Sequence, residues 1–293
     1  MIIDQEKCVA CGNCTYVCPM GAIYVDPVIN RATVERDECV ECYSCYNGMS
    51  KEHLNPTVVR LLRRLFKMAR LRFDPEPDVC PTSALTPDEL TWPRVIRRAF
   101  SDPLVPHEST GVRGRGTEEV KTNDLTGRVK RGEVNFTIEL GRPGVGVRMY
   151  DIQKMTMALA KIGVDFEKNN PITTLMPDPA TGALQPEVLN EKILSAIIEV
   201  LVKIDRLEEI VGVVREVEKQ VKTVVAIATG VRCDENGEEN DVAPIVQRLG
   251  FKLIRAKTNF GLGRITNPDY TPATAKTAVA GDPDAIKAGA GHD

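Results

Sequence analysis

The chain has 293 residues, 42% of them hydrophobic, and a formal net charge of -3. This length can bury a core in each of two domains, and the near-neutral charge argues against nucleic acid as a main partner, because duplex binding normally needs a dominant basic face. No apolar run approaches a membrane span, and the first residues contain neither a basic nor an apolar leader segment, so we expect a cytoplasmic protein.

Eight of the nine cysteines lie before residue 81. An odd total, crowded at one end, is typical of metal binding and not of a disulfide framework. We therefore expect a reducing compartment. Oxygen-sensitive metal chemistry also suggests an anaerobic host.

The first 45 residues contain an internal repeat with an offset of 31 residues. IDQEKCVACGNC at 3–14 matches VERDECVECYSC at 34–45. The first copy ends in CPMGAI at 18–23, whereas the matching end of the second copy, CPTSAL at 80–85, follows an insertion of 34 residues. Each copy therefore supplies three closely spaced cysteines and one cysteine that precedes a proline.

Three cysteines at two-residue gaps can wrap one [4Fe–4S] cluster, because a tight turn points their thiolates inward. In this arrangement the cysteine before proline reaches across to the other cluster. The predicted ligands of one cluster are Cys8, Cys11, Cys14 and Cys80. Those of the other cluster are Cys39, Cys42, Cys45 and Cys18. The sequence thus predicts two [4Fe–4S] clusters.

At these residues the sequence resembles the bacterial two-cluster [4Fe–4S] ferredoxin family, over residues 1–48 and 78–88. The resemblance implies a pseudo-twofold cluster domain whose two cubes lie close enough for rapid electron hopping. The chain departs from the family in its insertion, and Met49 stands where a compact second motif would have its fourth cysteine. This departure affects the assignment of Cys80 more than any other.

Structural zinc is the main alternative for CxxC motifs, but it prefers four ligands in two separated pairs. Another alternative is one intact cluster beside a degenerate one, although all eight cysteine positions are filled. A cube with four protein thiolates has no open iron, so it predicts a one-electron relay and no catalytic residue. Nearby acidic side chains would disfavour adding an electron: Glu35, Asp37, Glu38 and Glu41.

The insertion, 46–79, contains a predicted helix over residues 55–73, with Asn55 as N-cap and Pro56 at its first position. Its apolar side chains recur at helical spacing: Val58, Leu61, Leu62, Leu65, Phe66 and Ala69. The other face is basic: Arg60, Arg63, Arg64, Lys67 and Arg70. Such a face is usually just solvated, and the competing interpretation is a docking surface for an acidic partner.

The composition divides the chain into four predicted segments. They are a cluster domain at 1–100, a Gly/Pro/Ser/Thr-rich linker at 101–132, an α+β domain at 133–265 and an extended tail at 266–293. In the α+β domain we expect strands at 133–140, 164–169, 195–203 and 222–230, and helices at 149–162 and 204–221 with Asp205 as N-cap. Residues 186–193 favour a short helix, and a further helix and strand follow at 241–257.

These elements predict a βαββαβ sandwich, with two helices on one face of a four-stranded antiparallel sheet, so the fold class is α+β. The topology resembles small-ligand-binding regulatory modules of the ACT type. The loop Gly141–Arg148 suits either a tight turn or an anion site, and residues 111–116 suit a mobile linker or a phosphate grip. Four more residues match no ligand spacing: Cys233, His53, His107 and His292.

The predicted function is the iron-sulfur electron-transfer subunit of a multi-subunit cytoplasmic oxidoreductase, because about 200 residues lie outside the cluster segment. The expected partners are a catalytic chain with a flavin, tungsten, molybdenum or further clusters, and a second electron carrier. One alternative is a redox-responsive regulatory protein whose C-terminal domain binds a small ligand. Another is a free ferredoxin-like carrier.

Overall fold

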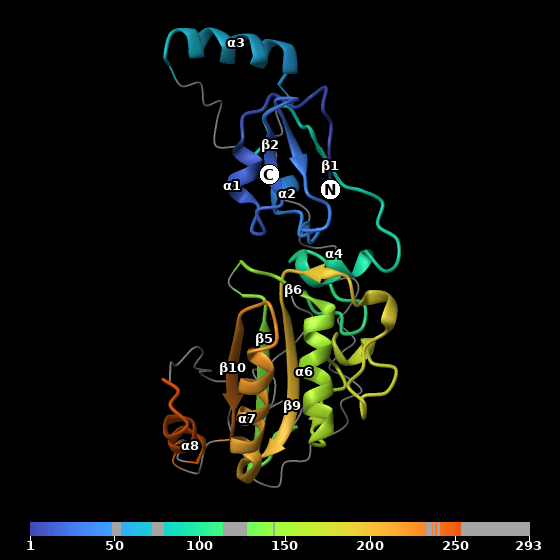
Figure 1. The fold of residues 1–293 in the computed structure, drawn as a ribbon, viewed down its shortest axis with the longest axis vertical. Helices are drawn as coiled ribbons and strands as arrows, with labels where there is room; N and C mark the ends of the chain where they lie inside the picture. The colour runs from blue at the N-terminus through green and yellow to red at the C-terminus, as the bar shows by residue number, and fades with distance from the viewer. Residues whose placement is uncertain are drawn as a thin grey trace, which may run out of the picture.

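The computed structural model describes residues 1–48, 54–71, 79–113, 128–142, 144–232, 236, 238 and 241–252. Two units follow one another along the long axis of the molecule, a cysteine-rich module and a larger unit of sheet and helices (Figure 1). Both contain helices and strands, so the chain is of mixed α+β class. None of the helices in the described ranges is long and apolar enough to cross a membrane.

The cysteine-rich module contains two short antiparallel ladders. Its elements are β1 (Ile2–Ile3), α1 (Asn13–Val17), β2 (Ile23–Asp26), β3 (Arg31–Val34), α2 (Ser44–Asn47) and β4 (Leu85–Thr86). β2 pairs with β3, and β1 pairs with β4 from beyond the insertion. The two halves also contain equivalent backbone hydrogen bonds. The N–H of Glu35 donates to the carbonyl of Ala22 (2.7 Å), and the N–H of Asp4 donates to the carbonyl of Ala84 (2.8 Å). CPTSAL therefore occupies in one half the position that CPMGAI occupies in the other.

The insertion carries α3 (Pro56–Met68), which lies at the far end of the module (Figure 1). The predicted start is confirmed, because the Asn55 side chain accepts hydrogen bonds from the backbone of Thr57 and Val58. The helix does not bury its apolar stripe. Val59 is the buried residue of α3, and all six predicted apolar positions are exposed or half-buried.

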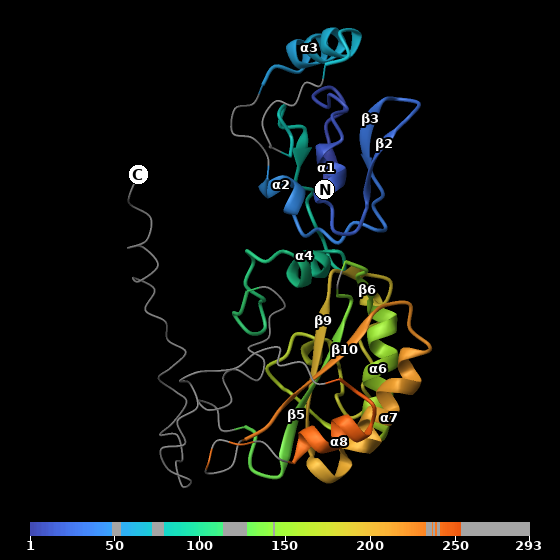
Figure 2. The same ribbon diagram turned by 90° about the vertical axis from the view of Figure 1, so that its left-hand side faces the viewer.

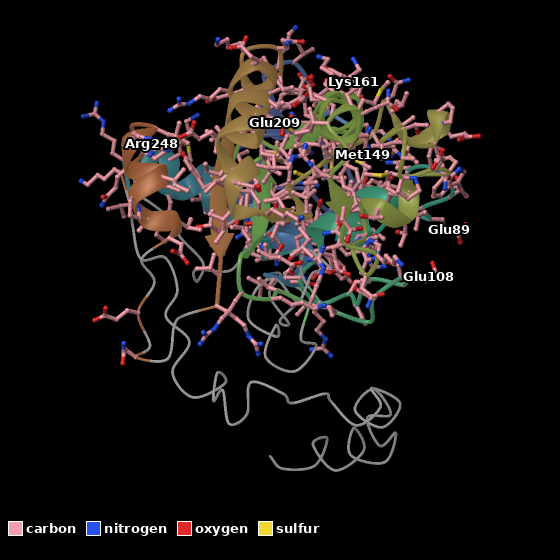
Figure 3. All side chains as sticks on the ribbon, turned by 90° about the horizontal axis from the view of Figure 1, so that it is seen from below. Glu89, Glu108, Met149, Lys161, Glu209 and Arg248 are labelled. Carbon is pink, nitrogen blue, oxygen red and sulfur yellow. The ribbon has the colours of Figure 1, made fainter. Side chains whose placement is uncertain are left out.

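The second unit is built on an antiparallel sheet with the strand order β10-β5-β9-β7. These strands are β5 (Glu133–Leu140), β7 (Asp165–Phe166), β9 (Ala196–Lys203) and β10 (Val225–Gly230). The helices α6 (Met149–Lys161) and α7 (Leu207–Glu218) cover one face of the sheet (Figure 2). Figure 3 looks along this layer, with Met149 and Lys161 marking α6 and Glu209 marking α7.

Alternating side chains of the two central strands build the core against these helices. They are Val134, Phe136, Ile138, Leu140, Ala196, Ile198, Val200 and Val202. The helices contribute residues at helical spacing, among them Ile152, Met155 and Leu159 of α6. The expected alternation and periodicity are thus confirmed at the centre of the sheet.

Smaller elements differ in detail from the prediction. A 3-10 turn, η4 (Ile204–Arg206), precedes α7, so the N-cap is Arg206, whose side chain forms no capping hydrogen bond, and the prediction of Asp205 is wrong. Residues 186–193 form η3 (Pro186–Val188) and the strand β8 (Lys192–Ile193), which pairs with β6 (Val147–Arg148). The turn η2 (Thr173–Leu175) and the helix α8 (Val242–Arg248) complete the described elements.

The helix α4 (Val95–Ser101) lies between the two units (Figure 1). Ile96 and Phe100 belong to the core of the second unit, although the composition placed them at the end of the cluster domain. The reason is that both side chains lie on the buried side of a helix that packs against β8. The centre of the predicted linker, 114–127, and the predicted tail lie outside the described residues.

We expect Gly141→Ala to destabilise the second unit by roughly 2–3 kcal/mol. Gly141 has φ +97°, and a Cβ there would lie 2.6 Å from the carbonyl oxygen of Leu194. The matched control is Gly163→Ala, at φ +66° with no atom within 4 Å of the new Cβ, which should cost only about 1 kcal/mol. Urea unfolding followed by circular dichroism measures both values, and equal losses would contradict the steric argument.

Candidate [4Fe–4S] centres

The first cavity opens between α1, β1, β4 and the end of the insertion. Four cysteines line it: Cys8, Cys11, Cys14 and Cys80. Its other walls are mainly apolar or backbone: Ile3, Val9, Gly12, Ala32, Val79, Thr82, Ala84 and Leu85. The structure therefore brings together the four cysteines that the motif assigned to one cluster.

The second cavity lies beside α2. Its cysteines are Cys18, Cys39, Cys42 and Cys45. The rest of its wall consists of Met1, Pro19, Met20, Ile23, Val40, Glu41 and Tyr43. Each cavity thus combines three cysteines of one copy of the repeat with the cysteine before proline of the other copy.

The insertion leaves and re-enters the module at one point, and this places Cys80 in the first cavity. The backbone N–H of Val79 donates to the carbonyl of Gly48 at 2.9 Å, across the whole insertion. Leu54 donates in the same way to the carbonyl of Pro81 at 2.9 Å. Cys80 therefore enters the module directly beside the position at which the compact motif would continue at Met49.

The cysteine turns need left-handed backbone at matching positions of the two copies. In the first copy these are Ala10 (φ 55°) and Gly12 (φ 82°), and in the second copy they are Glu41 (φ 53°) and Tyr43 (φ 58°). Residues other than glycine are strained in the left-handed conformation. Its use at matching positions of both copies therefore marks a turn that the site requires. In each copy the turn lies between the three closely spaced cysteines.

Backbone N–H groups donate to the cysteine sulfurs. Ala22 donates to Cys18 and Ala84 donates to Cys80, in each case over 3.2 Å from the residue four positions after the cysteine. Ala32 of β3 donates to Cys8 over 3.3 Å. Such bonds stabilise a thiolate and also tune an iron-sulfur cluster. Sequence analysis did not identify these alanines, although the shared CPxxA pattern was the available signal.

Burial disfavours the deprotonated form of the cysteines when no metal is bound. Burial, followed by the charges of neighbouring cysteines, raises the pKa of Cys14 and that of Cys45 to about 12. Burial also raises the pKa of Cys11 and Cys39. A positively charged iron centre would keep these sulfurs deprotonated, because a coordinating thiol loses its proton outright.

The four-cysteine sets suit a cluster better than one ion. No three His, Cys, Asp or Glu side chains of the described ranges are grouped as a site for a single metal ion. The cysteines instead surround cavities with largely apolar walls and N–H donors aimed at sulfur. This donor set fits a [4Fe–4S] cube, which supplies one-electron chemistry when it is bound.

The two cavities are neighbours. The charge of Cys45, from the second cavity, is among the smaller influences that raise the pKa of Cys14, from the first. The helices α1 and α2, which carry these cysteines, are also in contact. Redox groups in the two cavities would therefore lie close together.

Two arginines of α3 contact the loop 6–10, which carries Cys8 of the first cavity. Arg60 donates to the carbonyl of Cys8 at 3.1 Å and to that of Glu6, and Arg63 donates to the carbonyl of Ala10 at 3.4 Å. These two arginines therefore point inward, and the predicted basic face is only partly solvated.

Arg97 of α4 joins the second cavity loop to the second unit. It is 3% exposed and donates to the carbonyls of Asp37 (2.8 Å) and Cys39 (2.9 Å). It donates to the carbonyl of Arg36 as well, and to the carboxylate of Glu191. Nothing in the local sequence identified this residue, because its partners come from distant parts of the chain.

Three acidic side chains of the second copy, those of Asp37, Glu38 and Glu41, are paired with cations. Asp37 lies 2.6 Å from Arg148, and this hydrogen bond lowers its pKa. Glu38 pairs with Lys192 and Arg148. The buried Glu41 accepts from Arg94 (2.6 Å) and from the terminal ammonium of Met1 (2.5 Å). Their negative field at the second cavity is therefore smaller than the sequence alone suggests.

The glycine loop Gly141–Arg148 packs on the cysteine module. A Cβ at Gly144 would lie 3.6 Å from the carbonyl of Pro19, and one at Gly146 would lie 2.6 Å from the methyl end of Met20. The N–H groups of Gly141, Val145 and Gly146 donate to backbone carbonyls, so they are not available to an anion. The tight-turn interpretation is the one that the contacts support.

The remaining candidates lie apart from both cavities. His107 is buried beside Phe100, with ring centroids 4.9 Å apart, and its Nδ1 lies 3.0 Å from the Ser109 hydroxyl. Burial lowers its pKa. Residues 114–116 of the second glycine stretch lie outside the described residues, as do Cys233, His53 and His292.

Comparison with known proteins identifies the N-terminal segment. Residues 1–48 match the 4Fe-4S dicluster domain family. Pyruvate synthase subunit PorD of Methanocaldococcus jannaschii is 46% identical over 46 residues, which are 16% of this chain and 52% of that protein. The match thus spans about half the length of the relative, and the rest of this chain is unassigned. No solved structure matches the chain. The N-terminal segment carries two [4Fe–4S] clusters.

Proposed function

We propose that this chain is the electron-transfer subunit of a cytoplasmic oxidoreductase, and that its two clusters relay single electrons between a catalytic partner and an external carrier. The observation that carries the proposal is the pair of four-cysteine cavities. Four thiolates fill the protein positions of a cube and leave no iron open to substrate. The centre can then pass electrons but cannot bind a reactant.

The proposed ligand sets follow the two cavities. One cluster is held by Cys8, Cys11, Cys14 and Cys80. The other is held by Cys39, Cys42, Cys45 and Cys18. Each cluster takes its fourth sulfur from the other copy of the repeat, so both copies contribute ligands to both centres. The two centres then lie close enough for electron hopping.

The proposed partner is a catalytic oxidoreductase chain with a flavin, tungsten, molybdenum or further clusters. The similarity to PorD supports this, because that relative is named as a subunit of pyruvate synthase. The long second unit supports it as well, since a free carrier needs little more than its clusters. Cluster chemistry of this kind favours a reducing compartment in an anaerobic cell.

For the second unit we propose a βαββαβ sandwich that scaffolds the second cluster. The strand order β10-β5-β9-β7 and the connections β5-α6-β7 and β9-α7-β10 support this topology. The contacts of Arg97 support the scaffolding role. We place the division between the units ahead of α4, because Ile96 and Phe100 pack in the sheet core.

Anaerobic purification followed by iron and acid-labile sulfide analysis is the first test. We expect about eight iron and eight sulfide per chain, with an EPR spectrum of the reduced protein that shows two interacting clusters. About four iron per chain would remove one cube, and stoichiometric zinc would contradict the proposal. Co-purification with a large redox subunit from the native host then tests the partner.

The regulatory alternative makes a different prediction. It requires a monomer whose second unit is stabilised by a small metabolite, which a thermal-shift screen would detect as a concentration-dependent rise in Tm. The internal use of the glycine-loop amides weakens this alternative. Electron delivery that survives removal of the second unit would instead favour the free carrier.

A further inference from the structure

One side of α3 presents an apolar stripe to solvent. The exposed fractions are 54% for Val58, 56% for Leu61, 45% for Leu65 and 69% for Met68. Leu71, just past the helix, is 62% exposed and continues the stripe. Residues three or four positions apart share one side of a helix, so these side chains form a continuous surface. Single exposed apolar residues are ordinary, whereas a contiguous stripe marks an interaction site.

Cations border the stripe, and the segment 54–71 contains no acidic residue. Arg64, Lys67 and Arg70 are exposed, and none of them forms an ion pair with another residue that the structure describes. The surface cations of the second unit behave differently. They include Arg206 paired with Glu209, Lys219 with Glu216 and Arg248 with Glu208. Among the described residues, the positive charge of Arg64, Lys67 and Arg70 therefore has no ion-pair partner.

The same helix lies directly on the loop 6–10 at the first cavity. Arg60 and Arg63 bind the carbonyls of Cys8 and Ala10 from the side of the helix opposite the stripe, so a protein seated on the stripe would be separated from the first cavity by about the diameter of one helix, roughly 10 Å. The second cluster loop is instead covered by α4 and the β6–β8 ladder of the second unit (Figure 1). The first cluster is thus the end of the relay that faces away from the second unit.

Resting on the proposed relay function, we propose that α3 is the docking surface for a small acidic electron-carrier protein that exchanges electrons with the first cluster. The apolar stripe supplies the centre of the contact, and Arg64, Lys67 and Arg70 supply a rim complementary to carboxylates. An apolar centre that includes methionine, surrounded by a polar rim, is typical of protein interfaces. Charge complementarity also speeds association.

Other occupants fit less well. A second copy of the chain would bring like charges together around the stripe, which disfavours self-association. The C-terminal segment, 253–293, has no acidic excess to match the cations. An anionic membrane would match the charge, but it would not use the position of the helix over the first cluster, whereas a redox protein would.

The test is stopped-flow electron transfer from the reduced protein to a purified acidic bacterial ferredoxin at low ionic strength. The variant reverses the exposed cations: Arg64→Glu, Lys67→Glu and Arg70→Glu. We expect its second-order rate constant to fall by about tenfold or more and to lose most of its salt dependence. The matched control reverses three exposed cations of the second unit, Lys130→Glu, Lys161→Glu and Lys203→Glu, and should stay within about twofold of wild type.

A second variant, Leu61→Gln with Leu65→Gln, removes the apolar centre without changing charge. It should weaken binding of the ferredoxin, measured by titration calorimetry, while leaving the salt dependence of the rate unchanged. Both variants should keep the wild-type iron content and the wild-type rate of oxidation by a small neutral quinone. These readouts separate a docking defect from a damaged cluster.

Three results would overturn the docking proposal while leaving the relay function standing. One is a wild-type rate in both α3 variants. The others are equal loss in the control variant, and α3-dependent binding to phosphatidylglycerol vesicles or to a second copy of the chain without an effect on electron transfer. The relay function itself fails if the wild-type protein contains both clusters and yet transfers no electrons to ferredoxin, flavodoxin or the quinone.

Discussion

Replacing Cys80 with serine is expected to remove one of the two clusters and to spare the other. An insertion of 34 residues separates Cys80 from the last cysteine of its repeat, yet Cys80 lines the first cavity with Cys8, Cys11 and Cys14. A hydroxyl is a poor substitute for a thiolate at iron, so we expect the iron content to fall from about eight to about four per chain. Iron analysis and EPR of the anaerobically reduced protein measure the effect, and the interaction between clusters should vanish from the spectrum.

Cys18→Ser is the matched control, because Cys18 holds the equivalent position in the second cavity and receives the equivalent N–H bond. It should also leave about four iron per chain, but here the remaining cluster is that of the first cavity. The reduction potential of this cluster should therefore differ from that of the cluster left in Cys80→Ser. If both variants lose the same cluster, or if Cys80→Ser keeps all its iron, the crossed ligand assignment is wrong.

Replacing Arg97 with methionine is expected to destabilise the junction between the units by about 3–5 kcal/mol. The side chain of Arg97 is 4% exposed and that of its partner Glu191 is 12% exposed. Removal of the guanidinium leaves this carboxylate and the carbonyls of Asp37 and Cys39 without their buried donor. Denaturant unfolding and limited proteolysis between the units would detect the loss.

The control for this variant is Arg248→Met, which breaks an ion pair whose side chains are 65% and 51% exposed. Screening by solvent limits that loss to less than about 1 kcal/mol. Arg97→Lys should fall between the two, since an ammonium keeps the charge but cannot reach all the acceptors of a planar guanidinium. Equal stability of the Arg97→Met and Arg248→Met proteins would contradict a structural role for Arg97.

The elements with strong local signals were predicted well. The strand over 133–140 and the start of α3 at Asn55 and Pro56 depend on alternation and on capping, which neighbouring residues determine. Asp205 was wrong as a cap because a short 3-10 turn, invisible to periodicity, comes before α7. The exposure of the α3 stripe was also not predictable, since periodicity shows that a helix has an apolar side but not what covers it.

The sequence by itself determined the redox chemistry, because a cysteine turn is local and its repeat is readable at a spacing of two residues. The 4Fe-4S dicluster match over residues 1–48 confirms two clusters. Only the tertiary structure decided how Cys80 returns beside Gly48, how Arg97 reaches the carbonyl of Cys39 58 residues away, and which cavity is covered by the second unit. These contacts depend on the long-range packing of separate segments, in which each partner meets residues that its own neighbourhood in the chain does not specify.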